Sequence, residues 1–259
     1  MKDYIQELLR RKDLMFHLVF SGLKSQHKNS FLGYFWWLLD PMLNVLIYYF
    51  VVVIVFQRAK GTNFGVYLVI GMMVWRWMVS TVNTAAKSII QQAGIIAQVN
   101  LPKAQFPIGT VITQFINFGF GLIIIALFLI FFQILPGPEV FWLPVIVLVQ
   151  LLFMFALALP TAFISVFIRD VETMISHLTR LWFFGSPVIW YADMIPERGK
   201  WLLSINPMAH LLEAYRGVLM YHAEPNLSPL LVLAVVSGIV ICLGMVFYCR
   251  FEHKIIKVL

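Results

Sequence analysis

Charged side chains are scarce in this sequence. Asp, Glu, Lys and Arg make up only 12% of its 259 residues, whereas 61% are hydrophobic and 15% are aromatic. Soluble globular domains carry about 25% charged residues, so this chain has too little polar surface for an ordinary soluble fold. The shortage of charge indicates a protein of the lipid bilayer, in which Phe fills the hydrocarbon while Trp and Tyr favour the two interfaces.

Motifs of the common enzyme classes are also missing. The sequence contains no G-x-x-x-x-G-K-S/T phosphate loop, no H-E-x-x-H, no G-x-S-x-G and no Cys/His set at metal-ligand spacing. Its two cysteines, Cys242 and Cys249, would lie about 10 Å apart along one helix, beyond disulfide reach. We therefore predict no catalytic residue, no metal site and no cofactor in this chain. Any ATP and Mg²⁺ that power it would be bound by a partner subunit.

Acidic residues are few as well. The chain has 12 of them against 19 Lys and Arg, which gives a net charge of +7. The basic residues do not gather in a compact patch, so the charge does not indicate a nucleic-acid partner. If both termini are cytoplasmic, the inner segments hold 13 Lys and Arg and the outer segments hold 5. This bias follows the positive-inside rule and predicts a multi-pass protein with both termini in the cytoplasm.

Long apolar stretches are abundant by contrast. At a rise of about 1.5 Å per residue, six of them are long enough to cross about 30 Å of hydrocarbon. We place these spans at residues 38–56, 66–86, 108–135, 142–168, 174–191 and 230–249. The fifth has His177 and Arg180 near its start and Pro187 near its end, so we expect it to be broken or to stop short. The predicted fold class is an all-α integral membrane protein with six transmembrane helices.

Amphipathic segments precede and connect these spans. In residues 1–37, apolar residues recur at helical spacing between charged ones, which predicts an interfacial helix on the cytoplasmic surface. An ordinary soluble helix packed on a partner is the alternative. The inner loop 87–107 predicts a second amphipathic helix, parallel to the membrane. We see no repeat or linker, so residues 1–259 are predicted to form one transmembrane domain, with an N-terminal interfacial region at 1–37 and a six-span bundle at 38–259.

The outer segment, residues 192–229, also contains a helical pattern. From Met208 onward, apolar residues recur at the i, i+3, i+4, i+7 positions of one helix face, and Asn206 and Pro207 precede them. We expect one or two partial or re-entrant helices before the last span. Glu213 and Arg216 on this helix are candidate gate residues, and a local ion pair between them is the alternative.

Arg76 stands near the middle of the second span, between Trp75 and Trp77. A guanidinium at membrane depth is costly and should face a wet or protein-lined interior. Because its fork fits phosphate oxygens, we interpret Arg76 as a contact for an anionic group that passes through. The alternatives are a structural pair with Asp40 or a carbonyl, or a shifted span that lets the side chain reach an interface.

Several motifs in order along the chain resemble one transporter family. They are K-N-S-F-L-G-Y-F-W at 28–36, L-L-D-P at 38–41, F-I-R-D-V at 167–171, S-P-V-I-W-Y at 186–191, I-P-E at 195–197, I-N-P-M at 205–208 and the Tyr215-Arg216 pair. Together they resemble the permease subunits of ABC transporters of the ABC-2 type, specifically those that export cell-surface polysaccharides and teichoic acids. The first two motifs look most like the teichoic acid translocation permease.

This resemblance implies a homodimer in a bacterial cell membrane, docked on two copies of a cytoplasmic ABC ATPase. A coupling helix between spans two and three would enter the ATPase, with Gln92, Ile95, Ile96, Val99 and Asn100 at the contact. Arg169 and Asp170, in the turn after span four, would make a second contact. The implied cargo is a lipid-linked anionic polymer moved from the inner to the outer leaflet, with wall teichoic acid preferred over O-antigen or capsule polysaccharide.

The same resemblance, together with the physical analysis, suggests residues along the path of the cargo. Aromatic faces can stack on sugar rings, and polar groups can replace the water of a hydrophilic chain. The predicted pathway residues are Asp40, Asn44, Tyr48, Trp75, Arg76, Trp77, Phe118 and Trp182, and the predicted outer gate is Asn206, Glu213, Tyr215 and Arg216. Arg76 departs from the uncharged residue expected in the wider family, which fits an acidic cargo.

Two other functions compete with polymer export. An ABC-2 permease for a small hydrophobic drug or antibiotic would share the fold but differ in cargo. An ion-coupled secondary carrier would usually show inverted repeats, and an intramembrane enzyme would need a convergent acid, base or nucleophile. Neither of the last two features is visible in the sequence.

Overall fold

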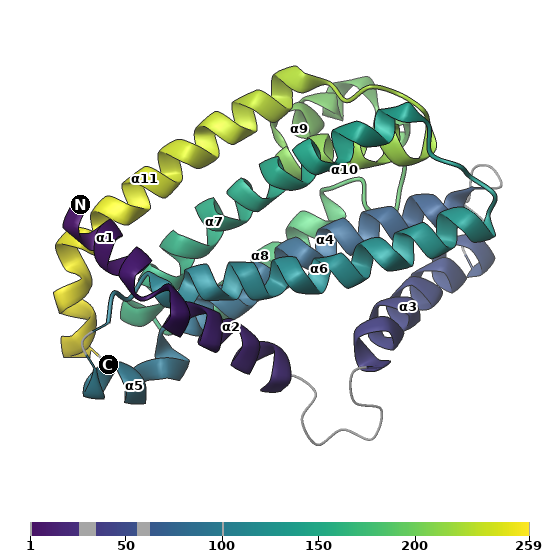
Figure 1. Ribbon diagram of the computed structural model, residues 1–259. Coiled ribbons are helices and arrows are strands. Elements are labelled where there is room, and N and C mark those ends of the chain that lie inside the picture. The colour runs from purple at the N-terminus through teal and green to yellow at the C-terminus, as the bar shows by residue number, and fades with distance from the viewer. Residues whose placement is uncertain (1, 26–34, 56–62, 100, 259) are drawn as a thin grey trace.

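The computed structural model describes residues 2–25, 35–55, 63–99 and 101–258. Within these ranges the regular elements are helices, and none is a strand. The longer helices are α1 (Lys2–Arg10), α2 (Lys12–Ser25), α3 (Trp36–Tyr49), α4 (Phe64–Ser88), α6 (Gln105–Phe131), α7 (Leu143–Phe167), α8 (Val171–Phe184), α10 (Pro207–Met220) and α11 (Leu227–Val258). The shorter ones are η2 (Phe50–Val55), η3 (Ile90–Gln92), α5 (Ala93–Gln98), η4 (Pro138–Trp142), η5 (Ala192–Met194), η6 (Glu197–Gly199) and α9 (Lys200–Ile205). Figure 1 shows them as one elongated bundle.

Five of the described helical segments are long and apolar enough to cross a membrane. They are Leu38–Val55, Phe64–Ser88, Gln105–Phe131, Pro138–Phe167 and Leu227–Ile256, which correspond to five of the six predicted spans. The all-α fold class is therefore confirmed, but the count of six spans is not. The predicted span at 174–191 falls on α8, which has 14 residues and ends at Phe184. At about 1.5 Å per residue it is about 21 Å long, short of the hydrocarbon thickness.

Helix α4 lies at the centre of the bundle. It contacts α3, α6, α7, α8 and α10, and 83% of its most apolar window is buried, against 17% for the span that begins in α3. Gln150 of α7 reaches into this core and donates from Nε2 to the Val74 carbonyl oxygen at 3.1 Å. The sequence makes such a helix possible because apolar residues occupy every face of its first half, residues 64–75.

The two chain ends lie at the same end of the molecule (Figure 1). The hydroxyl of Tyr4 on α1 donates to Glu252 Oε2 on α11 at 2.7 Å. The same carboxylate oxygen accepts from the backbone N–H of Lys103, and the backbone N–H of Ala104 donates to the Tyr4 hydroxyl. Burial, followed by the hydrogen bond to Glu252, raises the pKa of Tyr4 well above its ordinary value, so the phenol keeps its proton and remains a donor.

The N-terminal and inner-loop predictions are confirmed as helices, with shifted bounds. The amphipathic N-terminal region forms α1 and α2, which lie beside the bundle, with α2 packed against α6. The predicted inner-loop helix is the short pair η3 and α5. An ion pair between Lys87 at the end of α4 and Glu172 at the start of α8 places the α7–α8 turn at this same end.

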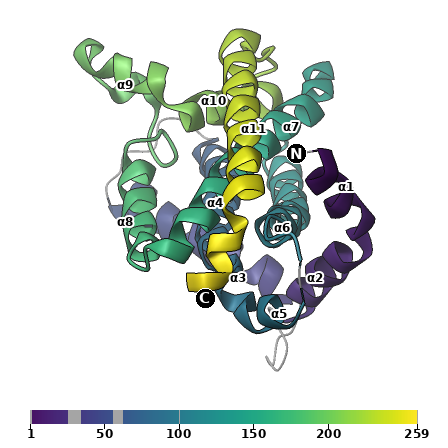
Figure 2. The same cartoon turned by 90° about the vertical axis from the view of Figure 1, so that its left-hand side faces the viewer.

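The segment at 192–229 forms two partial helices, α9 and α10, before the last span, as predicted. The helix predicted from Met208 is α10, with Pro207 at its first turn, but ten of its 14 residues are buried against α4, α7 and α11. Helix α9 projects from the bundle (Figure 2), and its side chains Trp201, Leu202 and Ile205 are exposed. The apolar face of α10 therefore packs in the protein core and does not face the membrane surface.

Because the Tyr4 hydroxyl joins α1, α6 and α11, Tyr4→Phe should loosen α1. We expect a loss of about 1.5–3 kcal/mol, the typical value for a hydrogen bond to a charged group, at this junction. Hydrogen exchange of the α1 amides should become at least tenfold faster. The control is Glu7→Gln, which removes only an exposed ion pair with Arg11. Equal exchange in Tyr4→Phe and the parent protein would contradict the junction.

Candidate functional site

A polar stripe runs along one side of α4. Ser80 follows Arg76 by four residues, and Asn83 and Thr84 follow Ser80 by three and four, so these side chains lie along one side of the helix. This face meets two cavities, of about 700 and 510 Å³, on the two sides of α3, and both are lined by Pro41, Arg76, Ser80 and Asn83. We call the two cavities together the α3–α4 groove.

The Asp40–Arg76 ion pair spans this groove. Arg76 Nη2 lies 2.6 Å from Asp40 Oδ2, and the two side chains are 41% and 48% exposed. The structural pair considered for Arg76 is therefore present, and the guanidinium also lines both cavities. A pair this exposed contributes at most about 1 kcal/mol to stability. Its effect is to hold a positive and a negative group at the centre of the groove.

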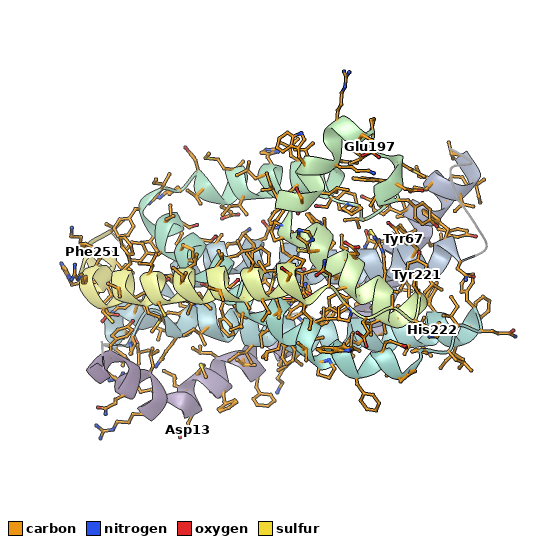
Figure 3. The ribbon with its side chains drawn as sticks, turned by 90° about the horizontal axis from the view of Figure 1, so that it is seen from above. Asp13, Tyr67, Glu197, Tyr221, His222 and Phe251 are labelled. Atoms are coloured by element: carbon orange, nitrogen blue, oxygen red, sulfur yellow. The ribbon has the colours of Figure 1, made fainter. Side chains whose placement is uncertain are left out.

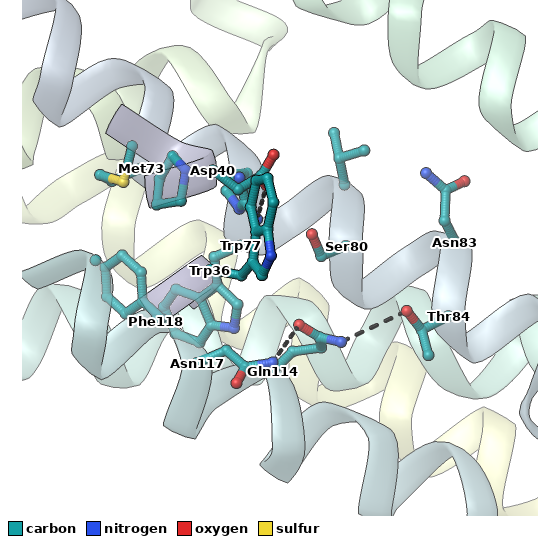
Figure 4. A pocket seen from close by; sticks show the side chains of 14 residues that line it. Trp36, Asp40, Met73, Trp77, Ser80, Asn83, Thr84, Gln114, Asn117 and Phe118 are labelled. Atoms are coloured by element: carbon teal, nitrogen blue, oxygen red, sulfur yellow. Dashed lines mark hydrogen bonds and ion pairs between the residues drawn. The ribbon is translucent and has the colours of Figure 1, made fainter. Parts of the chain in front are cut away.

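The larger cavity has an aromatic wall and an amide wall (Figure 4). The rings of Trp77 and Phe118 are stacked at 4.3 Å with an interplanar angle of 16°. Beside them on α6, Asn117 Nδ2 donates to Gln114 Oε1 at 3.2 Å, and Gln114 Nε2 donates to Thr84 Oγ1 at 3.5 Å. The Trp77 indole N–H is buried and has no hydrogen-bond partner among the described residues. Both rings are buried, at 3% and 4% exposure, so they form the packed floor of the cavity, and the amides beside them can bond the hydroxyl groups of a ligand.

The smaller cavity lies between α3, α4 and α8. Asn44, Tyr48 and Trp75 line it from α3 and α4, and Thr179 and Arg180 line it from α8. Asn44 turns part of its amide back to its own helix, since Nδ2 donates to the Asp40 carbonyl oxygen at 2.8 Å. A second cation, Arg180, therefore faces the same groove as Arg76.

Trp182 lies beside this cavity without lining it. Its ring packs edge-on to Trp75 at 5.8 Å, and its indole Nε1 donates to Asn206 Oδ1 at 2.9 Å. The structure thus gathers Asp40, Asn44, Tyr48, Trp75, Arg76, Trp77 and Phe118 around the groove. The remaining predicted pathway residue, Trp182, joins the C-terminal end of α8 to Asn206 and Trp75.

The groove continues toward the end that holds the termini. A third cavity, of about 270 Å³, shares Thr84 and Gln114 with the larger one. Its other lining residues include Gly22 of α2 and Gln91 and Gln92 of η3. Polar lining residues therefore continue from the middle of α4 toward α2 and η3.

Arg216, predicted at the outer gate, is buried in the protein. Its guanidinium donates to three backbone carbonyl oxygens: Nη1 to Pro187 at 2.6 Å, Nη2 to Val188 at 2.9 Å, and Nη2 and Nε to Tyr67 at 3.1 and 3.3 Å. The guanidinium carbon also lies 3.3 Å from the centre of the Tyr67 ring. The ion pair with Glu213 considered above is wrong, because Glu213 is exposed and the guanidinium points inward.

The reason for this burial is local. The chain turns at residues 185–190 after α8 ends, which leaves the carbonyl groups of Pro187 and Val188 outside any helix. Buried carbonyl groups need donors, and one guanidinium supplies several in a fixed fork. A Cβ on Gly71 would overlap the guanidinium and lie 2.7 Å from the Val188 carbonyl oxygen, so only glycine lets α4 approach so closely.

The other two predicted gate residues are also interior. The Asn206 side chain caps α10 by accepting from the Met208 backbone N–H at 3.0 Å, and it donates to Ser186 Oγ at 2.8 Å. Tyr215 is fully buried, and its hydroxyl has no hydrogen-bond partner among the described residues. Asn206, Tyr215 and Arg216 therefore stabilise the end of the fold opposite the termini, and the exposed Glu213 lines a cavity there.

The predicted ATPase contacts lie at the end with the termini. Ile95 and Val99 are 41% and 49% exposed, whereas Ile96 is buried against the inner cluster and Gln92 is half-buried. Arg169 and Asp170 are exposed in the α7–α8 turn. Asn100 lies outside the described residues.

Sequence reasoning missed much of the groove. It did not select Ser80, Asn83, Gln114 and Asn117, although these polar residues interrupt apolar helices at spacings of three or four. Combined with Arg76, that spacing is a usable signal for a polar face. The partners of Arg216, by contrast, are backbone carbonyl groups distant in sequence, which no residue pattern reveals.

Arg216→Met should destabilise the fold. It leaves buried carbonyl groups without donors, and we expect a loss of at least about 3 kcal/mol, measured as a lower denaturation midpoint of the purified protein. The adjacent control is Tyr215→Phe, which removes a hydroxyl that bonds to nothing described and should leave stability equal or higher. Equal stability of Arg216→Met and the parent protein would show that the fork is dispensable.

Comparison with known proteins places the chain in a family. The family model described as ABC-2 type transporter matches residues 14–220. The chain is 31% identical over 239 residues to the O-antigen export system permease protein RfbA of Myxococcus xanthus, which covers 92% of each chain. It is 27% identical over 248 residues to two RfbA permeases of Klebsiella pneumoniae, with 95% of each chain covered. This multi-pass membrane protein therefore belongs to the ABC-2 type transporter family.

Proposed function

We propose that this chain is the permease subunit of an ATP-driven exporter that moves a lipid-linked cell-surface polysaccharide to the outer leaflet. The family model and the names of the relatives, which are O-antigen export permeases, support this class of cargo. The single observation that carries the proposal is the α3–α4 groove, which offers charged, amide and aromatic groups on helices otherwise built for lipid. Lipid-facing helices have no use for such groups, and a hydrophilic chain crossing the bilayer requires them.

The groove suits a path shared by two copies. The span from α3 through η2 exposes Leu46, Ile47, Phe50 and Ile54, and only 17% of its window is buried. With the polar stripe directly behind it, a second copy packed against this side would close the groove into a channel. We therefore propose a homodimer, with one α3–α4 groove from each copy facing the cargo.

Energy would come from two copies of a cytoplasmic ABC ATPase, which would bind the ATP and Mg²⁺. The exposed side chains of Ile95, Val99, Arg169 and Asp170 gather at the end that holds both termini, and this end carries most of the Lys and Arg. The positive-inside rule places such an end in the cytoplasm. The proposed orientation puts both termini inside a bacterial cell membrane and α9 and α10 at the outer side.

The cargo class can be narrowed by the groove. Arg76 and Arg180 both line it, which favours a polymer that carries phosphate or another anionic group, at least in its lipid linkage. The relatives export O-antigen, and the preference for wall teichoic acid stays a prediction. A small hydrophobic drug is the weaker candidate, because it would leave the polar groups of the groove without partners.

Removing the ion pair should impair export more than folding. Arg76→Ala and Asp40→Asn should each lower polysaccharide export at least tenfold in cells, because the charged centre of the groove is lost. The change in stability should stay within about 1 kcal/mol, as expected for an exposed pair. Export is read as polymer on the cell surface, with denaturation midpoints as the folding control. Full export with Arg76→Ala would contradict a role of the groove.

An acidic side chain on α5 should uncouple the subunits. Ile95→Asp places a charge on an exposed apolar contact, so the ATPase should no longer co-purify with the permease. The matched control is Leu202→Asp on α9, an exposed apolar residue in the outer segment. If the ATPase co-purified with the Ile95→Asp permease as well as with the parent permease, α5 would not be part of the ATPase interface.

A further inference from the structure

A separate cavity lies at the outer end of the molecule. Its volume is about 740 Å³, and it shares no lining residue with the α3–α4 groove. It is bounded by the start of α4, by η5, α9 and α10, and by the chain between α10 and α11. Ligand sites typically measure about 300–1,000 Å³, so the space suits a ligand of two or three sugar rings.

Contacts within the protein hold the aromatic wall of this cavity in place without a ligand. The Tyr67 ring has the Arg216 guanidinium at 3.3 Å and the Tyr191 ring at 4.3 Å. The Tyr67 hydroxyl donates to the Trp190 carbonyl oxygen at 2.8 Å, which prevents the ring from turning. Tyr221 adds a further ring that is 55% exposed (Figure 3). These side chains come from three segments, so the wall is a feature of the tertiary fold.

Hydrogen-bonding groups of both kinds surround this wall. Three carboxylates, Asp193, Glu213 and Glu224, reach the cavity from η5, from α10 and from the chain before α11. Lys200 and His210 line it as well, with His210 Nε2 2.9 Å from the Ser204 carbonyl oxygen. The cavity therefore offers acceptors and donors around rings, which is the complement of a sugar with its C–H faces and hydroxyl groups.

The charges of the cavity select against anions. Lys200 is paired with Glu197, and the N–H groups of Arg216, the other cation that lines the cavity, are directed to carbonyl oxygens. The three carboxylates outnumber these two cations, so the cavity has a net negative charge and disfavours a phosphate headgroup or an acidic sugar. A neutral glycan needs no countercharge and uses the donors and the acceptors alike, whereas a hydrophobic cation would use the acceptors alone.

We propose that this outer cavity binds a short, uncharged stretch of glycan, separately from the groove. The proposal rests on the proposed function in one respect, namely that the glycan is part of the exported polymer. In that role the cavity would bind neutral sugar units as they leave the channel, while Arg76 and Arg180 of the groove would bind anionic groups.

The test is a glycan array probed with the labelled complex of the permease and its ATPase in nanodiscs, without ATP. The array carries neutral trisaccharides, including maltotriose, mannotriose and chitotriose, beside trigalacturonate as the acidic probe. We expect retention on at least one neutral glycan and none on trigalacturonate. Glu213→Gln and Tyr221→Ala, which alter exposed side chains, should each weaken retention at least tenfold, and Glu172→Gln at the inner end should leave it unchanged.

Four outcomes would overturn the proposal: no retention on any neutral glycan, equal retention on trigalacturonate, retention that survives both cavity variants, or displacement by a hydrophobic cation such as tetraphenylphosphonium at lower concentration than by free trisaccharide. The proposed function is judged separately, by surface polymer in cells. Glycan retention without polymer export would refute the exporter alone, and export without retention would refute the cavity alone.

Discussion

The constraint on which this structure depends is that polar groups in a bilayer protein must face protein or cargo, because lipid cannot hydrate them. Helix α4 meets this constraint in two ways. Its apolar faces are enclosed by α6, α7, α8 and α10, and its polar face opens on the α3–α4 groove. An isolated arginine at the bilayer centre costs about 2.5–3.5 kcal/mol or more, and Asp40 offsets part of that cost. The most enclosed helix thereby also presents a charge to the groove.

Two arginines illustrate how partners decide a role. Arg216 has three carbonyl oxygens and a tyrosine ring around it, is 3% exposed and stabilises the turn after α8. Arg76 has one carboxylate and an open cavity on each side of α3. The first side chain has all its strong contacts within the fold, so it serves structure. The second borders open space on both sides of its ion pair, which is why we propose it as a contact for the cargo.

The sequence could predict features that depend on one segment alone, but not those that depend on contacts between segments remote in sequence. Five spans follow directly from runs of apolar residues, since lipid requires length and hydrophobicity alone. The short α8 was suspected from Pro187, but its end at Phe184 depends on contacts with Asn206 and Arg216 that are remote in sequence. Likewise, α10 was predicted as a helix from its spacing, and its burial was not, because an apolar stripe is the same whether it faces lipid or core.

The candidate site was partly predictable for a related reason. A charge inside a span is visible in sequence, which is why Arg76 and its partner Asp40 were selected. The amides of Gln114 and Asn117 complete the groove from α6, and their position relative to α4 depends on how two helices pack, which periodicity does not give. Trp182 was selected for its ring, yet its indole N–H bonds Asn206, a partner that only the fold reveals.

The division of labour between a membrane path and a separate motor can be measured in proteoliposomes. The permease is reconstituted with or without its ATPase, and translocation of a lipid-linked polysaccharide is read from its accessibility to an added glycosidase. The account predicts translocation only when permease, ATPase and ATP are all present. Equal translocation by the permease alone, without ATPase or ATP, would contradict it.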